Sequence, residues 1–138
     1  AMVVCNEKSV KPNSGPVALI TGYSYVANEP GLLFDAPSTA VEDLLQKTGG
    51  SISDFDLIEI NEAFAVQTLA CMKELNLDAE KVNQEGGAIA LGHPVGASGA
   101  RLATHIAHRI HTGNTQRGLA SLCVGGGMGV AVTLQSVS

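Results

Sequence analysis

The apolar and polar positions change their spacing along the chain, and each spacing predicts one element. Residues 16–27, "PVALITGYSYVA", are rich in β-branched and aromatic side chains, which favour a strand. In residues 36–47 leucines and a valine recur at helical spacing up to Gly49, so this segment is predicted to be a helix. Residues 55–60, "FDLIEI", are short and mostly apolar, which indicates a second strand.

The next part of the chain carries two further predicted helices. The apolar residues of 62–75, "EAFAVQTLACMKEL", suit a largely buried helix, and Asn61 in front of it is a plausible N-cap. Residues 98–111 place a leucine and two isoleucines on one face and most of the basic residues elsewhere. This pattern predicts an amphipathic helix that ends at Gly113.

The last apolar stretch, residues 118–135, predicts two strands. The sequence "GGGMG" at 125–129 joins them, which predicts either an antiparallel pair or a bend near the centre of the sheet. The order strand, helix, strand, helix, helix, strand, strand predicts an α/β domain with a layered mixed β-sheet and helices on both faces. The opening residues 1–4, "AMVV", form a strand-like run cut off at its front.

The composition narrows the class of ligand. The 138 residues are 45% hydrophobic and carry a formal net charge of -5, which suits neither nucleic acid nor anionic lipid as a partner. No apolar run approaches the ~20 residues of a membrane span, and the start lacks the features of a signal peptide. We therefore expect a cytoplasmic protein that binds a small neutral or organic molecule and neither nucleic acid nor a membrane.

The cysteines and three of the histidines suggest no metal site. Three cysteines at irregular spacing predict neither a disulfide framework nor a zinc site. Cys71 lies in an apolar helical pattern that suits packing, and Cys5 lies in a polar leader, so neither is expected to be a nucleophile. His105, His108 and His111 recur at every third position, but no cysteine or carboxylate joins them.

The fourth histidine lies in a different setting, within "NQEGGAIALGHPVGASGAR" at 83–101. A lone histidine in a loop often has only a structural role. Here Pro94 fixes the position of His93, and the glycines around it let the backbone approach a ligand closely, which suits a general base. These glycines are not a nucleotide fingerprint, because "GHPVGASG" lacks the Gly-Lys-Ser/Thr of a P-loop.

Two other residues have both a structural and a functional interpretation. Cys123 ends an apolar run and would ordinarily be a small buried side chain. The three glycines after Val124 leave backbone N–H groups uncovered, and these could face a developing oxyanion. Asn61 is a plausible helix cap, but it also lies at a strand-to-helix junction, where α/β folds place their ligands.

Three segments together resemble the C-terminal signatures of the thiolase family. They are "NEAFA" at 61–65, "NQEGGAIALGHPVGASG" at 83–99 and "CVGGGMG" at 123–129, and their order and spacing also match. The resemblance covers nearly the whole chain. It implies a thiolase-like C-terminal domain and a coenzyme A-dependent acyl transfer, either thiolytic cleavage of a 3-oxoacyl-CoA or the reverse Claisen condensation.

The resemblance also implies a role for each site residue. His93 would be the base that activates a nucleophilic cysteine and helps to bind the thioester oxygen. Cys123 would be the second thiol, which moves the proton at the substrate α-carbon. The Gly125 N–H would belong to one oxyanion hole, and Asn61 would hold a water for the other.

Substrate binding is expected near two further residues. Phe64 would wall the acyl pocket, and Gly92 would lie beside the substrate. Coenzyme A would take part as a substrate, with no permanently bound cofactor and no metal.

The chain departs from the family in one respect, since a full thiolase has two similar halves and only the second resembles this chain. Residues 1–16 would then be the crossover strand and linker from the first half, and residues 17–138 the C-terminal domain. The nucleophilic cysteine and most of the coenzyme A-binding residues belong to the first half. The chain by itself is therefore expected to be inactive.

Two functions remain open. The chain is either the C-terminal half of a split thiolase, completed by a separately encoded N-terminal half in a homo- or hetero-oligomer, or a truncated, non-catalytic domain that serves only in association. In both cases an apolar surface meant for the other half would be exposed, which favours dimerisation or aggregation.

Overall fold

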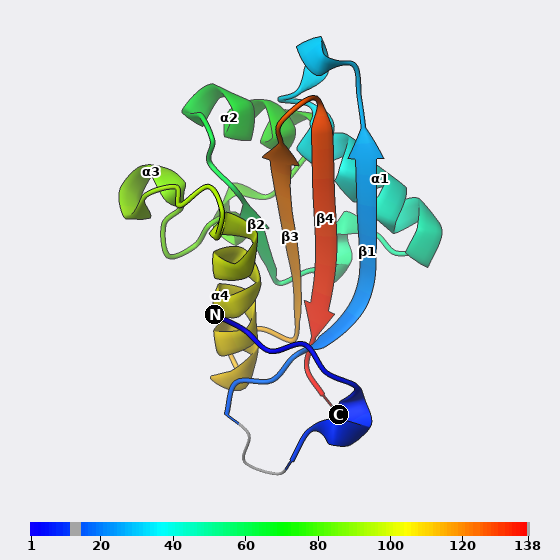
Figure 1. Ribbon diagram of the computed structural model, residues 1–138, viewed down its shortest axis with the longest axis vertical. Coiled ribbons are helices and arrows are strands. Elements are labelled where there is room, and N and C mark those ends of the chain that lie inside the picture. Colours follow the sequence, from blue (N-terminus) through cyan, green and yellow to red (C-terminus); the bar gives the residue numbers. More distant parts are fainter. Residues whose placement is uncertain (12–14, 138) are drawn as a thin grey trace.

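A single mixed sheet organises the domain in the computed structural model, which describes residues 1–11 and 15–137. Its strands are β1 (Leu19–Ala27), β2 (Leu57–Ile60), β3 (Arg117–Val124) and β4 (Met128–Gln135). Their order is β1-β4-β3-β2, in which β2 and β3 are parallel and the other pairs antiparallel (Figure 1). The strands predicted within 16–27, 55–60 and 118–135, the antiparallel pair and the mixed sheet are thus confirmed.

Four α-helices accompany the sheet in the described residues: α1 (Ala36–Thr48), α2 (Ala65–Glu74), α3 (Ala88–Leu91) and α4 (Ser98–His111). Short 3-10 turns occupy Glu7–Ser9, Pro30–Leu32, Ile52–Asp54 and Ala79–Lys81. The helix predicted at 36–47 extends one residue further and ends at Gly49, and the helix predicted at 98–111 has those bounds. The short α3 has no counterpart in the sequence pattern. No helix in residues 1–11 or 15–137 is long and apolar enough to cross a membrane.

The two faces of the sheet carry separate cores. On one face Ile58 and Ile60 of β2 pack with Leu44 of α1. On the other face Leu57 packs with α4, whose buried residues include Leu102. Helices therefore lie on both faces, as the sequence predicts, and strand alternation assigns each side chain of β2 to one of the two faces.

The covering of the sheet is incomplete at its β1 edge. The helix α4 contacts β2, β3 and β4, whereas α1 contacts β1, β3 and β4. Tyr23 and Tyr25 of β1 point away from the α1 face and are 75% and 58% exposed. An apolar part of this sheet face is consequently open to solvent.

Three expectations about local structure are wrong. Residues 1–4 form no strand, because they pair with no other segment, and Val3 is 90% exposed. Asn61 is not a helix cap, since α2 begins only at Ala65 and Phe64 occupies its N-cap position without a side-chain bond. The helix α2 is not largely buried either: it buries Gln67, Thr68 and Cys71, while its Val66, Leu69 and Ala70 are exposed.

Candidate active site

The carboxyl end of the parallel pair β2 and β3 brings two predicted site residues to one edge of the sheet. Asn61 follows β2 directly, and its backbone N–H donates to the Ser121 carbonyl at 2.9 Å. Cys123 lies two residues beyond Ser121 on β3. The parallel register, in which Ile60 is opposite Ser121, thus places Asn61 and Cys123 near the same end of the sheet.

His93 reaches this edge from the glycine-rich segment. The helix α3 ends at Gly92, whose φ of 96° reverses the backbone in a way that favours glycine. His93 Nε2 lies 3.5 Å from Asn61 Nδ2, and His93 Nδ1 lies 2.6 Å from Ser98 Oγ. The structure therefore brings Asn61 and His93 together, and it adds Ser98, which the sequence pattern did not single out.

The hydrogen bonds around Ser98 select one form of the His93 ring. The Ser98 hydroxyl donates to the Pro94 carbonyl at 3.2 Å, so its oxygen remains as an acceptor for an N–H at His93 Nδ1. The proton of the neutral ring then lies on Nδ1, and Nε2 keeps a lone pair. That lone pair faces the donor amide of Asn61, in the orientation a general base requires.

Asn61 has an unused acceptor. Its exposed fraction is 0%, and its Oδ1 has no hydrogen-bond partner among the described residues. A buried polar atom without a partner is costly, so it is usually satisfied by water or a ligand. This atom is the part of the site best suited to hold a water.

Cys123 approaches the edge from the opposite face of the sheet. Ser121, two positions earlier, donates its hydroxyl to the Pro37 carbonyl of α1, so Cys123 also points to the α1 face, whereas Asn61 points to the α4 face. The thiol is half-buried, and burial, with a smaller effect of nearby Cys71, raises its pKa. In the described residues no hydrogen bond joins this thiol to Asn61 or His93.

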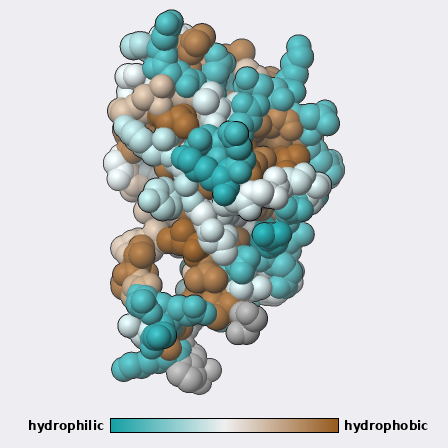
Figure 2. Space-filling model, turned by 90° about the vertical axis from the view of Figure 1, so that its right-hand side faces the viewer, coloured by the Kyte–Doolittle hydropathy of each residue, from teal (hydrophilic) through white to brown (hydrophobic). Residues whose placement is uncertain are grey.

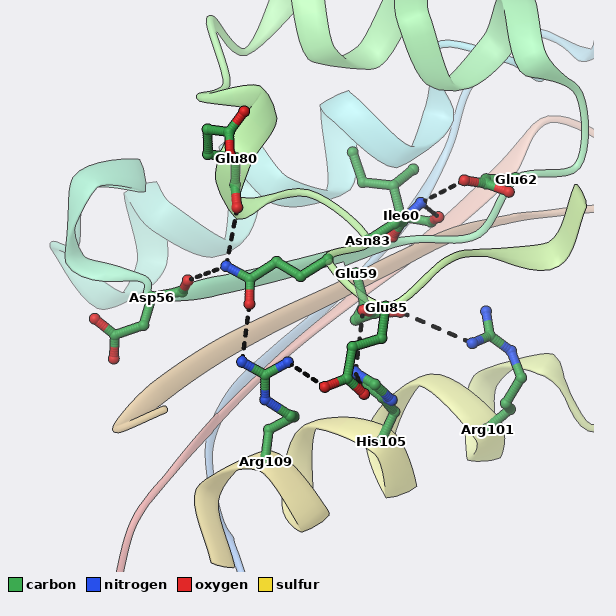
Figure 3. A network of polar contacts seen from close by, with 11 residues as sticks. Asp56, Glu59, Ile60, Glu62, Glu80, Asn83, Glu85, Arg101, His105 and Arg109 are labelled. Carbon is green, nitrogen blue, oxygen red and sulfur yellow. Dashed lines mark hydrogen bonds and ion pairs between the residues drawn. The ribbon is translucent and has the colours of Figure 1, made fainter. Parts of the chain in front are cut away.

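The segment before His93 is tied to the end of β2. The side-chain amide of Asn83 accepts from the Ile60 N–H at 3.0 Å and donates to its carbonyl at 2.9 Å. Glu62 accepts from Asn83 at 3.0 Å and from the Ile89 N–H at 2.8 Å. These bonds, partly visible in Figure 3, fix the segment that carries His93 against the strand that carries Asn61.

The remaining predicted residues are two glycines and a phenylalanine. Gly125 begins the turn between β3 and β4, where a Cβ would meet no atom within 4 Å. A Cβ at Gly92 would likewise meet no atom within 4 Å. Phe64 is 58% exposed and packs edge-to-face on Phe34, with ring centroids 5.3 Å apart.

A second polar cluster lies behind the site, between β2 and α4 (Figure 3). Glu59 of β2 is fully buried and faces Arg101 and His105, while Arg109 binds Glu85 at 2.7 Å. This cluster was not predicted from the sequence, in which the basic residues of 98–111 were expected only to lie away from the apolar face of the helix. A signal was available, since a glutamate inside a buried apolar strand is usually paired with a polar or cationic group, and Arg101 and His105 are one helical turn apart. Residues 1–11 and 15–137 contain no group of three potential ligands close enough to hold a metal ion.

Comparisons with known proteins agree with the arrangement of these segments. Residues 14–136 match the family model described as "Thiolase, C-terminal domain". The chain is 42% identical to an acetyl-CoA acetyltransferase of Chromobacterium violaceum over 97% of its own length and 34% of that protein. It is 42% identical to the human mitochondrial 3-ketoacyl-CoA thiolase over its full length and 35% of that protein. A cytosolic acetyl-CoA acetyltransferase of Mus musculus is 48% identical over 87% of this chain and 30% of that protein.

Solved structures of thiolases also superpose on this chain. The crystal structure of the Bacillus anthracis acetyl-CoA acetyltransferase superposes with a TM-score of 0.86 at 44% identity, over 95% of this chain and 32% of that one. The human mitochondrial 3-ketoacyl-CoA thiolase in complex with CoA gives 0.84 at 44% identity, over 88% and 31%. The chain thus spans about a third of the length of the proteins it matches.

Proposed function

Since this chain belongs to the thiolase family and matches its C-terminal domain, we propose that it supplies the base and the second thiol of a coenzyme A-dependent acyl transfer. The reaction is thiolytic cleavage of a 3-oxoacyl-CoA or its reverse, the Claisen condensation of two acyl-CoA molecules. The observation that carries the proposal is the His93 ring, with Nδ1 bound to Ser98 and Nε2 directed at Asn61. That geometry presents an unprotonated nitrogen at the sheet edge to which Asn61 also belongs.

The proposed mechanism begins with a nucleophilic cysteine that lies outside these 138 residues. His93 Nε2 takes its thiol proton, and the thiolate attacks the 3-oxo carbon of the substrate. The bond between C2 and C3 then breaks, which leaves an acyl group on that cysteine and an acetyl-CoA enolate. Cys123 gives its proton to the enolate carbon, a role for which a thiol kept protonated by burial is suited.

The second half of the cycle regenerates the nucleophile. The thiol of coenzyme A loses its proton to the Cys123 thiolate and attacks the acyl carbonyl, so that a shortened acyl-CoA leaves. The nucleophilic cysteine departs as a thiolate and takes back its proton from His93. A water on the free Asn61 Oδ1 stabilises the enolate oxygen, and the Gly125 N–H donates to the oxyanion of the acyl-enzyme. Coenzyme A is therefore a substrate, and no permanently bound cofactor takes part.

Phe64 and Gly92 are proposed to contact the substrate. The exposed ring of Phe64, held by Phe34, would form one wall of the acyl pocket, and Gly92 leaves room beside His93. The exposed apolar residues of α2 lie on the same stretch of chain and would be covered in the complete site.

The partner we propose is a separately encoded N-terminal thiolase half. The exposed apolar surface of β1 and α2, and a cavity of about 610 Å³ between the N-terminal segment and the body of the domain, support a covering by an N-terminal half, whether or not that half is a separate chain. Figure 2 shows apolar residues on both sides of this hollow. The division into a linker at 1–16 and a domain at 17–138, and a cytoplasmic location, remain predictions.

Thiolysis of acetoacetyl-CoA by the chain alone and by the chain with a candidate N-terminal half tests the proposal. We expect activity only in the mixture, lost in His93→Ala and Cys123→Ala. The matched controls His111→Ala and Cys5→Ala, both at exposed positions, should keep it. Activity of the chain alone would overturn the assignment of the nucleophile. A stable but inactive complex would favour the second function, a domain that serves only in association.

A further inference from the structure

Glu59 is an ionisable side chain inside a buried strand, with an exposed fraction of 0%. Because successive side chains of a strand point to opposite faces, Glu59 and Asn61 share the face of β2 that α4 covers. Leu57, the third residue on this face, packs in one core with Leu102 and Ile106 of α4. The carboxylate is therefore enclosed between β2 and α4, just behind the candidate active site.

The carboxylate of Glu59 meets two cationic or potentially cationic groups. Its Oε2 lies 3.8 Å from Arg101 Nη1, and its Oε1 lies 3.6 Å from His105 Nε2. His105 also lies 3.9 Å from Glu85, which binds Arg109. Neither oxygen of Glu59 accepts a hydrogen bond from the described residues, so attraction between charges rather than hydrogen bonding holds the contact.

The contact between Glu59 and Arg101 connects the same strand and helix that Asn61, His93 and Ser98 connect. Arg101 lies three residues after Ser98 on α4, about one turn or roughly 4.5 Å along the helix. Glu59 lies two residues before Asn61, roughly 6.7 Å along the strand. His93 bridges the far ends, at 2.6 Å from Ser98 and 3.5 Å from Asn61. A change in the separation of Glu59 and Arg101 therefore changes the separation of helix and strand where His93 is held.

We propose that Glu59 is a positioning residue: its contact with Arg101 fixes the first turn of α4 against the end of β2 and so sets the geometry of the His93–Asn61 pair. The inference rests on the proposed function only for the catalytic meaning of that pair. The coupling between the Glu59–Arg101 contact and the His93–Asn61 pair does not depend on whether the pair is catalytic.

The charge state of Glu59 makes this coupling sensitive to pH. The charged groups that face it are Arg101, His105 and Arg109 from α4, Glu85 from the segment before α3, and Glu62 after β2. From β3 its neighbour is the apolar Ala120. Burial raises the pKa of Glu59 to about 7 against the opposing effect of Arg101, and burial also lowers the pKa of His105. Above neutral pH the carboxylate of Glu59 is ionised and attracts Arg101. Below neutral pH the carboxyl group is protonated, and its contact with Arg101 weakens.

NMR spectroscopy of the isotope-labelled chain tests the coupling without any assay of activity. The readouts are the side-chain amide of Asn61 and the ring nitrogens of His93 at about pH 9, where Glu59 is ionised. We expect Glu59→Gln and Arg101→Gln each to shift both sets of signals, and the double variant to shift them no further than the larger single effect. Glu42→Gln, the same chemical change at an exposed position of α1, should leave them in place.

A purely structural role predicts a different result. It would spread the changes over α4 and the core, and it would make the effects of the two variants additive. Unchanged Asn61 and His93 signals in Glu59→Gln, or additive shifts, would overturn the proposal. If Glu59→Gln does not fold, Arg101→Gln carries the test, because the Glu59 carboxyl can still be titrated while Asn61 no longer follows it. Failure of the thiolysis experiment would leave these outcomes unaffected.

Discussion

The Nδ1 atom of His93 lies 2.6 Å from the Oγ of Ser98, which stands in the first turn of α4. The imidazole is thus anchored to a long helix, although it belongs to a loop rich in glycine. The Ser98 hydroxyl donates its proton to the Pro94 carbonyl, so the Ser98 oxygen acts as the acceptor in its bond with His93. The Nδ1 atom of His93 must therefore carry the proton. One hydroxyl group therefore fixes both the orientation of the ring and the nitrogen that is free to act as a base.

Removal of this hydroxyl should reduce activity more than binding. In Ser98→Ala the ring can rotate and carry its proton on either nitrogen, and the loss of a net hydrogen bond of ~1 kcal/mol or more corresponds to about fivefold or more in kcat. The KM of the reconstituted enzyme should change little. Ser9→Ala, at an exposed position, is the control, and an undiminished kcat in Ser98→Ala would show that another group orients His93.

Glu59 should make the stability of the domain fall as the pH rises. Burial raises its folded-state pKa from 4.5 to about 7, so between these values the unfolded chain is ionised while the folded chain keeps its proton. Relative to Glu59→Gln, the free energy of unfolding should therefore decline by about 3 kcal/mol across this window and remain level above it. Urea unfolding at a series of pH values measures the difference, and parallel profiles for the two proteins would contradict it.

Gly129 allows the hairpin to approach the start of α1. A Cβ at this position would overlap the carbonyl oxygen of Ala36, a backbone atom that cannot move aside alone. Gly129→Ala should lower the free energy of unfolding by about 2 kcal/mol or more. Gly125→Ala, where the new Cβ meets nothing within 4 Å, should stay within about 0.5 kcal/mol of the unchanged protein. Equal stability of the two variants in urea unfolding would refute the close contact.

The three thiols should react with iodoacetamide in a fixed order. Cys5 is exposed, Cys123 is half-buried with a pKa raised by burial, and Cys71 is buried. Near neutral pH, Cys5 should be alkylated first, Cys123 more slowly, and Cys71 only after unfolding. Peptide mass mapping over time measures the order. Alkylation of Cys123 as fast as Cys5 would mean that its thiolate is stabilised by a group outside the described contacts.

The open face of β1 should drive self-association of the chain alone. Sedimentation analysis over a range of concentrations should show dimers or larger species, because Tyr23 and Tyr25 leave an apolar surface uncovered. Tyr23→Lys should weaken this association severalfold. Gln46→Lys adds the same charge at an exposed position of α1 and should not. A monodisperse monomer at all concentrations would count against an interface on β1.

Much of the fold could be predicted from the sequence because it depends on local periodicity. The spacing of 3.6 residues marks α1 and α4 to within a residue, and the glycines of 125–127 mark the turn of the hairpin. The three family signatures also led to the segments that meet at the edge of the sheet. The exposed apolar residues of α2 could not be foreseen, since a pattern shows that a face is apolar and not whether this chain covers it.

The sequence by itself determined the four strands of the sheet, the helices α1 and α4, their order and the residue types available for chemistry, since each of these follows from neighbours along the chain. Only the tertiary structure decided that Asn61 faces His93 instead of capping α2, that Ser98 selects the ring nitrogen, and that Glu59 is enclosed opposite Arg101. Hydrogen bonds and ion pairs act over a few ångströms in space. Their partners are therefore set by how strands and helices pack, which the spacing of residues along the chain does not specify.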